Sequence, residues 1–219
     1  MRVLTWNLFH GRSIPNAGRG LAAEFAEALA GWEWDVALLQ EVPPWWPEGL
    51  AAATGARQHH VRTSRNWGLA GRRAISSRNP DLLKANGGGC NCILVRGQAG
   101  DHRTQRLTWL PERRWAHGVR LGDRTRVVNL HGTRGGTPRS WADARLAAAK
   151  AFEWAGGAPL VLGGDFNLRG TPELPGLRHV AGNFVDHLYV SGLEPRGKRE
   201  VLDRGALSDH RPVAIELDG

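Results

Sequence analysis

Long apolar runs are absent from this sequence of 219 residues. No apolar stretch approaches the ~20 residues that a transmembrane helix needs, so we expect no stable membrane association. The amino-terminal segment MRVLTWNLFHG alternates like a strand and lacks the apolar centre of a signal peptide. We therefore predict a cytoplasmic location.

Cysteine is also scarce. The two cysteines, Cys90 and Cys92, are too few for a disulfide framework, and their spacing is a weak signal for metal binding. We expect two buried thiols. The motifs HExxH, GxSxG and GxxxxGK(S/T) are missing, so a zinc peptidase, a serine hydrolase and a P-loop enzyme have no support.

Lysine is rare among the basic residues. Only three of the 29 basic residues are lysines, and the net charge is +8. The many arginines, with abundant alanine and glycine, reflect either a GC-rich genome or a polyanionic partner. Because the arginines are dispersed rather than clustered, charge alone favours nucleic acid only modestly.

Apolar alternation and helical periodicity predict an α+β protein. We expect strands at residues 2–9, 35–40, 90–96, 104–110, 159–164, 185–190 and 212–217, and a hairpin within residues 113–131 that turns at Gly122-Asp123. Helices are expected at residues 19–31, 47–54 and 138–155, and a loop at residues 64–90. This order predicts one domain over residues 1–219, with two packed sheets covered by helices.

Polar side chains mark one end of several predicted strands. Each alone is an ordinary strand end or turn residue, but buried strands that end repeatedly on polar groups indicate a shared site. The residues are Asn7, Glu41, His131, Asp165 with Asn167, Asp186, and Asp209 with His210. Carboxylates are ligands for hard cations such as Mg²⁺. We expect these residues to converge on a site for hydrolytic phosphoryl transfer.

Six short motifs resemble those of the endonuclease/exonuclease/phosphatase family, which includes DNase I-like and exonuclease III-like nucleases. They are TWN (5–7), LQE (39–41), NLH (129–131), GGDFN (163–167), VDHLYV (185–190) and SDH (208–210), in the family's order. The resemblance implies a four-layer αββα sandwich of two mixed, mostly antiparallel sheets flanked by helices. It also implies one or two divalent ions, Mg²⁺ or Mn²⁺, at one edge of the sheets.

The same resemblance implies a role for each matching residue in the metal site. Glu41 would be the principal metal ligand. Asn7 would lie beside the ion and help to hold it, and Asp209 would also serve the metal.

Five residues are implied to be catalytic. Asp165 would orient or deprotonate the attacking water, and Asn167 would hydrogen-bond the scissile phosphate. His210 would stabilise phosphate charge or act as the base, with Asp186 holding its tautomer. His131 would donate to a phosphate oxygen or to the leaving group. The identity of the base stays open, because family members differ.

Five residues near the motifs are candidate substrate contacts. They are His10, Arg12, Asn91, Arg134 and Arg169. Residues 62–78 are strongly basic and include Trp67, so this segment either grips a nucleic-acid backbone with a base stacked on the indole or forms a surface loop.

The sequence therefore favours a monomeric, metal-dependent endonuclease that acts on nucleic acid, with DNA preferred. One alternative is a phosphomonoesterase or a lipid or small-molecule phosphodiesterase of the same fold, which the apolar PPWWP segment (43–47) would suit as a membrane-facing hairpin. Another is a non-catalytic nucleic-acid-binding protein, but the complete set of polar residues argues against it.

Overall fold

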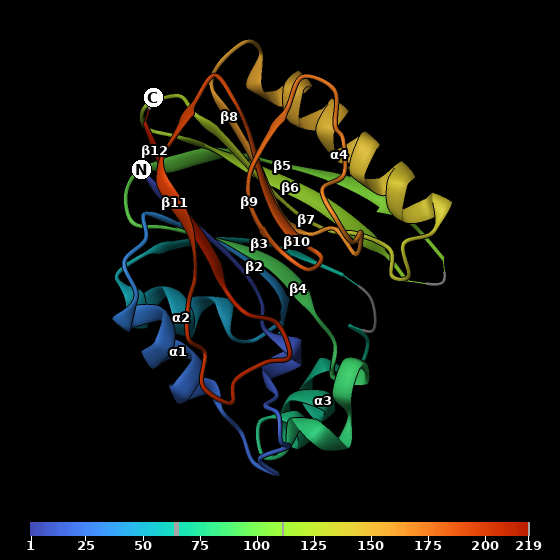
Figure 1. Ribbon diagram of the computed structural model, residues 1–219. Coiled ribbons are helices and arrows are strands. Elements are labelled where there is room, and N and C mark those ends of the chain that lie inside the picture. The colour runs from blue at the N-terminus through green and yellow to red at the C-terminus, as the bar shows by residue number, and fades with distance from the viewer. Residues whose placement is uncertain (64–65, 111, 219) are drawn as a thin grey trace.

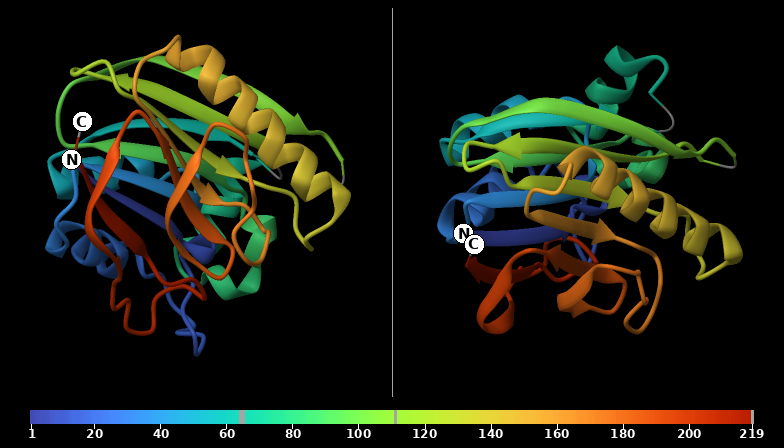
Figure 2. Two further views of the ribbon diagram at one scale, coloured as in Figure 1. Left: turned by 45° about the horizontal axis from the view of Figure 1, so that its top comes forward. Right: turned by 90° about the horizontal axis from the view of Figure 1, so that it is seen from above.

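The computed structural model describes residues 1–63, 66–110 and 112–218. Within these residues, two six-stranded sheets pack face to face, and helices cover their outer faces (Figure 1). The two chain termini lie side by side at one end of the sandwich (Figure 2). The predicted α+β sandwich of two sheets flanked by helices is confirmed.

The first sheet has the strand order β11-β12-β1-β2-β4-β3. β1 and β2 run parallel at its centre, and the other neighbours are antiparallel. Its strands are β1 (Arg2–Asn7), β2 (Val36–Val42), β3 (Arg57–Arg62), β4 (Cys90–Val95), β11 (Glu194–Val201) and β12 (Val213–Asp218).

The second sheet has the order β5-β6-β7-β8-β10-β9, and β7 and β8 are its central parallel pair. Parallel neighbours need a crossover connection, and each crossover here contains a helix, α1 in the first sheet and α4 in the second. The strands are β5 (Ala99–Thr108), β6 (Arg114–Leu121), β7 (Arg126–His131), β8 (Leu160–Asp165), β9 (Arg178–Asn183) and β10 (Asp186–Ser191).

Local sequence signals set the ends of the helices. α4 (Pro138–Ala155) has the predicted bounds, because the hydroxyl of Thr137 caps its amino end and Gly156 ends it in a left-handed conformation. α2 (Pro47–Thr54) also has the predicted bounds, and proline occupies its first position. α1 (Ala22–Gly31) begins later than the predicted residue 19.

The predicted loop at residues 64–90 is wrong in part. α3 (Leu69–Ser76) lies within it, and 3-10 turns follow at Pro80–Leu82 and Lys84–Gly87. α3 has only eight residues and lies in a stretch rich in arginine, glycine and asparagine, so the composition favoured a loop. Residues 64 and 65 of that prediction lie outside the described residues.

Three strands were not predicted, and all three lie at sheet edges. β3, β9 and β11 have the sequences RQHHVR, RHVAGN and EPRGKREV. An edge strand pairs on one side only, and charged side chains on it discourage pairing with other chains. Such strands lack the apolar alternation on which the sequence prediction relied.

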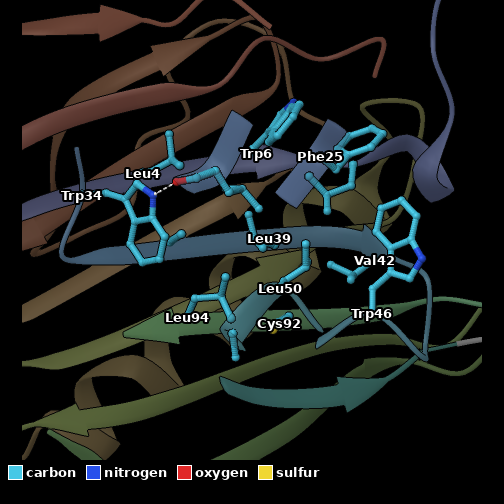
Figure 3. Packing of buried hydrophobic residues seen from close by; sticks show 14 of the residues in the cluster. Leu4, Trp6, Phe25, Trp34, Leu39, Val42, Trp46, Leu50, Cys92 and Leu94 are labelled. Carbon is cyan, nitrogen blue, oxygen red and sulfur yellow. Dashed lines mark hydrogen bonds between the residues drawn. The ribbon is translucent and has the colours of Figure 1, made fainter. Parts of the chain in front are cut away.

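Aromatic side chains fill the layer between the first sheet and its helices. The rings of Trp6 and Phe25 lie 5.1 Å apart, and those of Phe25 and Trp46 lie 5.4 Å apart (Figure 3). The indole of Trp34 donates to the carbonyl of Leu29 at 2.8 Å, the dashed line in Figure 3. Burying these rings stabilises the contact between α1 and the sheet.

The PPWWP segment (43–47) does not form an exposed hairpin. The suggestion that it faces a membrane, made for a lipid substrate, is therefore wrong. Trp46 is only 9% exposed, and it lines a pocket of about 640 Å³ together with Trp45 and Leu50. Cys90 and Cys92 are free and buried, as predicted. Among the described residues, none of the helices is long and apolar enough to cross a membrane.

A polar chain crosses the otherwise apolar layer between the sheets. Gln40 Nε2 donates to Asn129 Oδ1 at 2.8 Å, and Asn129 Nδ2 lies 3.4 Å from His117 Nε2. His117 Nδ1 lies 3.0 Å from His102 Nε2, near His59. Burial, reinforced by the neighbouring histidines, holds the pKa of His117 well below its ordinary value, so His117 stays neutral in the folded protein.

We expect acid to destabilise the fold through these histidines. In the unfolded chain the pKa of His117 returns to about 6.5, so below that pH the unfolded state binds more protons and the free energy of unfolding falls. A fully depressed histidine contributes a slope of about 1.4 kcal/mol per pH unit. Urea unfolding between pH 7 and pH 5 should therefore show a shallower decline for His117→Gln than for the wild type; equal slopes would contradict the assignment.

Candidate active site

The carboxyl ends of the two parallel strand pairs meet at one edge of the sandwich. β1 and β2 bring Asn7 and Glu41 there, and β7 and β8 end at His131 and Asp165. A hydrogen bond of 2.9 Å from Asn7 Nδ2 to Asp165 Oδ2 joins the two sheets at this edge. These side chains line a cleft of about 1230 Å³ that Asp186, Asp209 and His210 also line.

Two glycines allow β8 to deliver Asp165 into this edge. A Cβ on Gly163 would lie 2.3 Å from Leu188 Cδ2, and a Cβ on Gly164 would lie 2.0 Å from the carbonyl oxygen of Leu130. Gly164 also has a φ of +137°, which residues with side chains rarely adopt. The strand therefore needs glycine at both positions, where its neighbours approach the backbone closely.

Replacement of Gly164 by alanine should destabilise the protein by about 3 kcal/mol, because the new Cβ meets rigid backbone and the φ is strained. Thermal unfolding followed by circular dichroism measures the effect. Gly49→Ala in α2 is the matched control, since no atom lies within 4 Å of its added Cβ. A Gly164→Ala variant as stable as the wild type would show that this approach is not tight.

The chain turns sharply after Asp165, so Asp165 and Asn167 do not lie on one continuous strand. β8 ends at Asp165, and Asn167 adopts a left-handed φ of 53°. The amide of Asn167 donates to Asp165 Oδ1 at 2.9 Å, and its Nδ2 donates to the carbonyl of Gly132 at 3.0 Å. Asn167 thus keeps its second Nδ2 hydrogen for a ligand.

Asp165 is a buried carboxylate surrounded by donors. Its Oδ2 lies 3.5 Å from His131 Nε2 and 4.0 Å from His210 Nε2, and it accepts the hydrogen bond from Asn7. Burial raises the pKa of Asp165, against the lowering effect of His210 and the two hydrogen bonds. A raised pKa makes this carboxylate a stronger proton acceptor than an exposed aspartate.

Asp186 and His210 form a tight pair beside it. Asp186 Oδ2 lies 2.7 Å from His210 Nδ1. Burial acts to lower the pKa of His210, but the hydrogen bond and charge of Asp186, with Asp165 and Asp209, outweigh it and raise that pKa. His210 is therefore an imidazolium whose Nε2 hydrogen faces the cleft.

Ser208 fixes the loop that carries this histidine. Its hydroxyl donates to the carbonyl of Asn7 at 2.6 Å and accepts from the amide of His210 at 3.0 Å. Ser208 has a left-handed φ of 62°. Ser208 was not among the predicted site residues, although the SDH motif contained it.

His131 is held neutral by a residue that the sequence prediction missed. Burial and then the charge of Arg114 hold the pKa of His131 well below its ordinary value. Arg114 Nη1 lies 2.9 Å from Nδ1 and 2.8 Å from Nε2 of that ring. Because a guanidinium only donates, the ring nitrogen that binds it acts as an acceptor. Arg114 begins a strand far from the motifs in sequence, so no sequence signal pointed to it.

Comparison with known proteins agrees with this geometry. The sequence profile described as "Endonuclease/Exonuclease/phosphatase family" matches residues 4–210. The chain belongs to this family. Its members are hydrolytic phosphoesterases that generally depend on divalent metal ions, so the protein is a phosphoesterase.

Solved structures of the endonuclease/exonuclease/phosphatase family share the fold. One from Beutenbergia cavernae has a TM-score of 0.75 at 19% identity over 99% of this chain and 71% of that chain. A mannosyl-6-phosphatase from Bacteroides thetaiotaomicron has a TM-score of 0.74 at 18% identity over 100% of both chains. TDP2 from Caenorhabditis elegans has a TM-score of 0.70 at 17% identity over 98% of this chain and 73% of that chain. No curated protein sequence matches the chain significantly.

The carboxylate and imidazole groups in the cleft are suitable ligands for the divalent cation on which the family depends. Glu41 Oε2 lies 3.1 Å from His10 Nε2, and Glu41 Oε1 lies 3.8 Å from His131 Nε2. Among the described residues, no arginine or lysine pairs with Glu41, so its carboxylate is open to a cation. Ligand atoms of Asp165, Asp186 and His210 also lie within 4.8 Å of one another. Carboxylate oxygens suit Mg²⁺ and Mn²⁺.

Asn7 and Asp209 differ in how they face this centre. Asn7 Oδ1 accepts from the amide of Phe9 at 2.9 Å while Nδ2 holds Asp165, so the carboxamide mainly orients that carboxylate. Asp209 is exposed on the cleft, with Oδ1 3.8 Å from His210 Nε2. Asp209 therefore has a carboxylate free to meet a ligand.

Four of the five candidate substrate contacts line the cleft, namely His10, Arg12, Arg134 and Arg169. Arg12 is already bound, because its Nε donates to Asp81 Oδ1 at 2.8 Å. Asn91 is wrong as a substrate contact. It is fully buried in β4, and its Nδ2 donates to the carbonyl of Trp115 at 3.0 Å.

Proposed function

We propose that the protein is a divalent-metal-dependent phosphodiesterase that cleaves nucleic acid as an endonuclease. The observation that carries this proposal is the charge of the cleft. Around the central carboxylates and histidines, the cleft is lined by Lys84, Arg134, Arg169, Arg204 and Arg211. Cationic side chains in the same cleft as an acidic, metal-binding centre suit a polyanionic substrate that is cleaved at that centre.

The buried groups divide the chemistry of hydrolysis among them. Asp165 orients the attacking water and takes its proton, since its pKa is raised and its Oδ1 and Oδ2 are held by two donors. His210, as an imidazolium, donates to a phosphate oxygen and stabilises the negative charge that develops there. Asp186 holds the tautomer and charge of His210.

Neutral donors complete the site. Asn167 offers its free Nδ2 hydrogen and His131 its ring N–H to the phosphate or the leaving group. A divalent cation, held by Glu41 with Asp209 and Asn7 nearby, would supply Lewis-acid stabilisation of the phosphate charge.

The test is nicking of supercoiled plasmid by the wild-type protein with Mg²⁺ or Mn²⁺, against the same reaction in EDTA. Cleavage that requires the metal and is lost in Asp165→Asn supports the proposal. Mannose 6-phosphate and 4-nitrophenyl phosphate are assayed in parallel. Turnover of these monoesters without cleavage of DNA or RNA would overturn the proposal and favour a phosphomonoesterase of the same fold.

A further inference from the structure

Three aromatic rings that project into solvent each carry an arginine on one face. The guanidinium carbon of Arg72 lies 4.1 Å from the ring centre of Trp67, that of Arg106 lies 3.6 Å from Trp109, and that of Arg169 lies 4.9 Å from Phe184. Arginine on an aromatic face is an attractive contact, and it fixes the ring while leaving the opposite face open.

The exposure of these rings is unusual for aromatic side chains. Trp67 is 75% exposed, Trp109 is 59% exposed and Phe184 is 68% exposed. Among the described residues, the only other aromatic side chain with comparable exposure is Phe152, at 36%. Large apolar side chains left in water mark binding surfaces more often than random surface, particularly when they gather in one region.

All three rings lie at the edge of the sandwich that holds the active site. Phe184 lines the cleft directly. Trp109 follows the end of β5, where Thr108 pairs with Arg114, the residue that contacts His131. In both views of Figure 2, the free end of the β5–β6 hairpin lies at the end of the molecule remote from the termini.

Trp67 reaches the same edge from the other sheet. Four residues before it, Thr63 follows the end of β3 and lines a small pocket with His10, Glu41 and His131. α3, which carries Arg72, also lies toward the end remote from the termini in Figure 2. Phe184 thus lines the cleft, and Trp109 and Trp67 follow strands that end at the same edge of the sandwich.

The arginines on these rings keep their charge for a ligand. Arg72, Arg106 and Arg169 have no carboxylate within ion-pair distance in the part of the chain that the structure describes. Arg12, by contrast, lies over Phe9 but is paired with Asp81. Each exposed ring thus offers a flat apolar face beside an uncompensated positive charge.

We propose that these three arginine-backed rings bind unpaired bases of a single-stranded polynucleotide on either side of the phosphate that is cut. A base in a duplex has both faces covered by its neighbours, whereas an unpaired base stacks on an aromatic side chain while arginine binds the adjacent phosphate. This inference rests on the proposed function and narrows its substrate from nucleic acid to single strands.

The test measures binding separately from cleavage. Asp165→Asn protein in EDTA is titrated with an oligothymidylate of about 15 nucleotides, with oligouridylate of equal length and with a duplex of equal length, at about 0.1 M salt. Fluorescence anisotropy of the labelled strands gives the affinities. We expect either single strand to bind at least tenfold more tightly than the duplex, and the ratio of the two single strands tells DNA from RNA.

The tryptophans are then replaced in the same background. Trp67→Ala and Trp109→Ala should each weaken single-strand binding about tenfold, in the range measured for loss of one stacked base. Phe152→Ala on α4 is the control and should bind normally. In the active protein, the two tryptophan variants should still hydrolyse bis(4-nitrophenyl) phosphate at the wild-type rate.

Equal affinity for single strand and duplex, or unchanged affinity in both tryptophan variants, would overturn the inference. That result would leave the proposed function intact if the wild-type protein still nicks plasmid. Absence of metal-dependent cleavage of both plasmid and single-stranded oligonucleotide, with normal single-strand binding, would instead contradict the proposed function.

Discussion

Asp165→Asn should lower the turnover number by about three orders of magnitude and leave the fold intact. The asparagine keeps the size of the side chain but cannot accept the proton of the attacking water. It also places an amide where Oδ2 now faces Asn7 Nδ2, His131 and His210. The measurement is the steady-state rate on a fluorogenic oligonucleotide, with circular dichroism and thermal unfolding to check the fold.

Asp123→Asn is the matched control for this substitution. Asp123 caps the turn of the β6–β7 hairpin by accepting from the amide of Thr125, at the opposite edge from the site. We expect the wild-type rate from this variant. A rate for Asp165→Asn within tenfold of the wild type would show that another group accepts the proton.

Glu41→Gln should remove the response of the protein to metal and lower the rate by a similar factor. A cation that binds only the folded protein stabilises it by about 2.7 kcal/mol at a hundredfold excess over the dissociation constant. The substitution replaces the carboxylate of Glu41 by a neutral amide. The loss of negative charge weakens the attraction that compensates for the cost of dehydrating the ion. Addition of Mn²⁺ should therefore raise the melting temperature of the wild type and have little effect on Glu41→Gln.

Glu27→Gln on the exposed face of α1 controls for the general loss of a negative charge. Its melting temperature should rise with Mn²⁺ as the wild type does. The same shift in Glu41→Gln as in the wild type would place the metal elsewhere, and the group of Asp165, Asp186 and His210 would then be the first alternative.

The sequence predicted the central elements of the fold and missed its margins. α2 and α4 have proline at their starts and glycine after their ends, and their bounds were predicted to the residue. The buried central strands were predicted because their short, continuous apolar runs are typical of strands that are covered on both faces. The edge strands β3, β9 and β11 are polar, so only their pairing partners, which are distant in sequence, make them strands.

The same division holds for the site. Residues at the ends of buried strands, such as Glu41 and Asp165, stood out because a polar group there contradicts its apolar surroundings. Arg114 and Phe184 did not stand out, since each is ordinary in its local sequence and gains its place from packing across the sheet. The prediction of Asn91 as a substrate contact was wrong, because its side-chain amide donates to a backbone carbonyl inside the fold.

The strand orders of the two sheets contain an internal symmetry. The order β11-β12-β1-β2-β4-β3 maps position by position onto β5-β6-β7-β8-β10-β9, with α1 and α4 as the matching crossovers. At the site, Asn7 lies opposite Gln40 in the first sheet, and His131 lies opposite Asp165 in the second. Equivalent places hold unlike groups, so a substrate lying between the two sheets meets a different chemistry on each side. Neither sheet carries all of the catalytic residues. The active site therefore forms only when the two sheets have packed together.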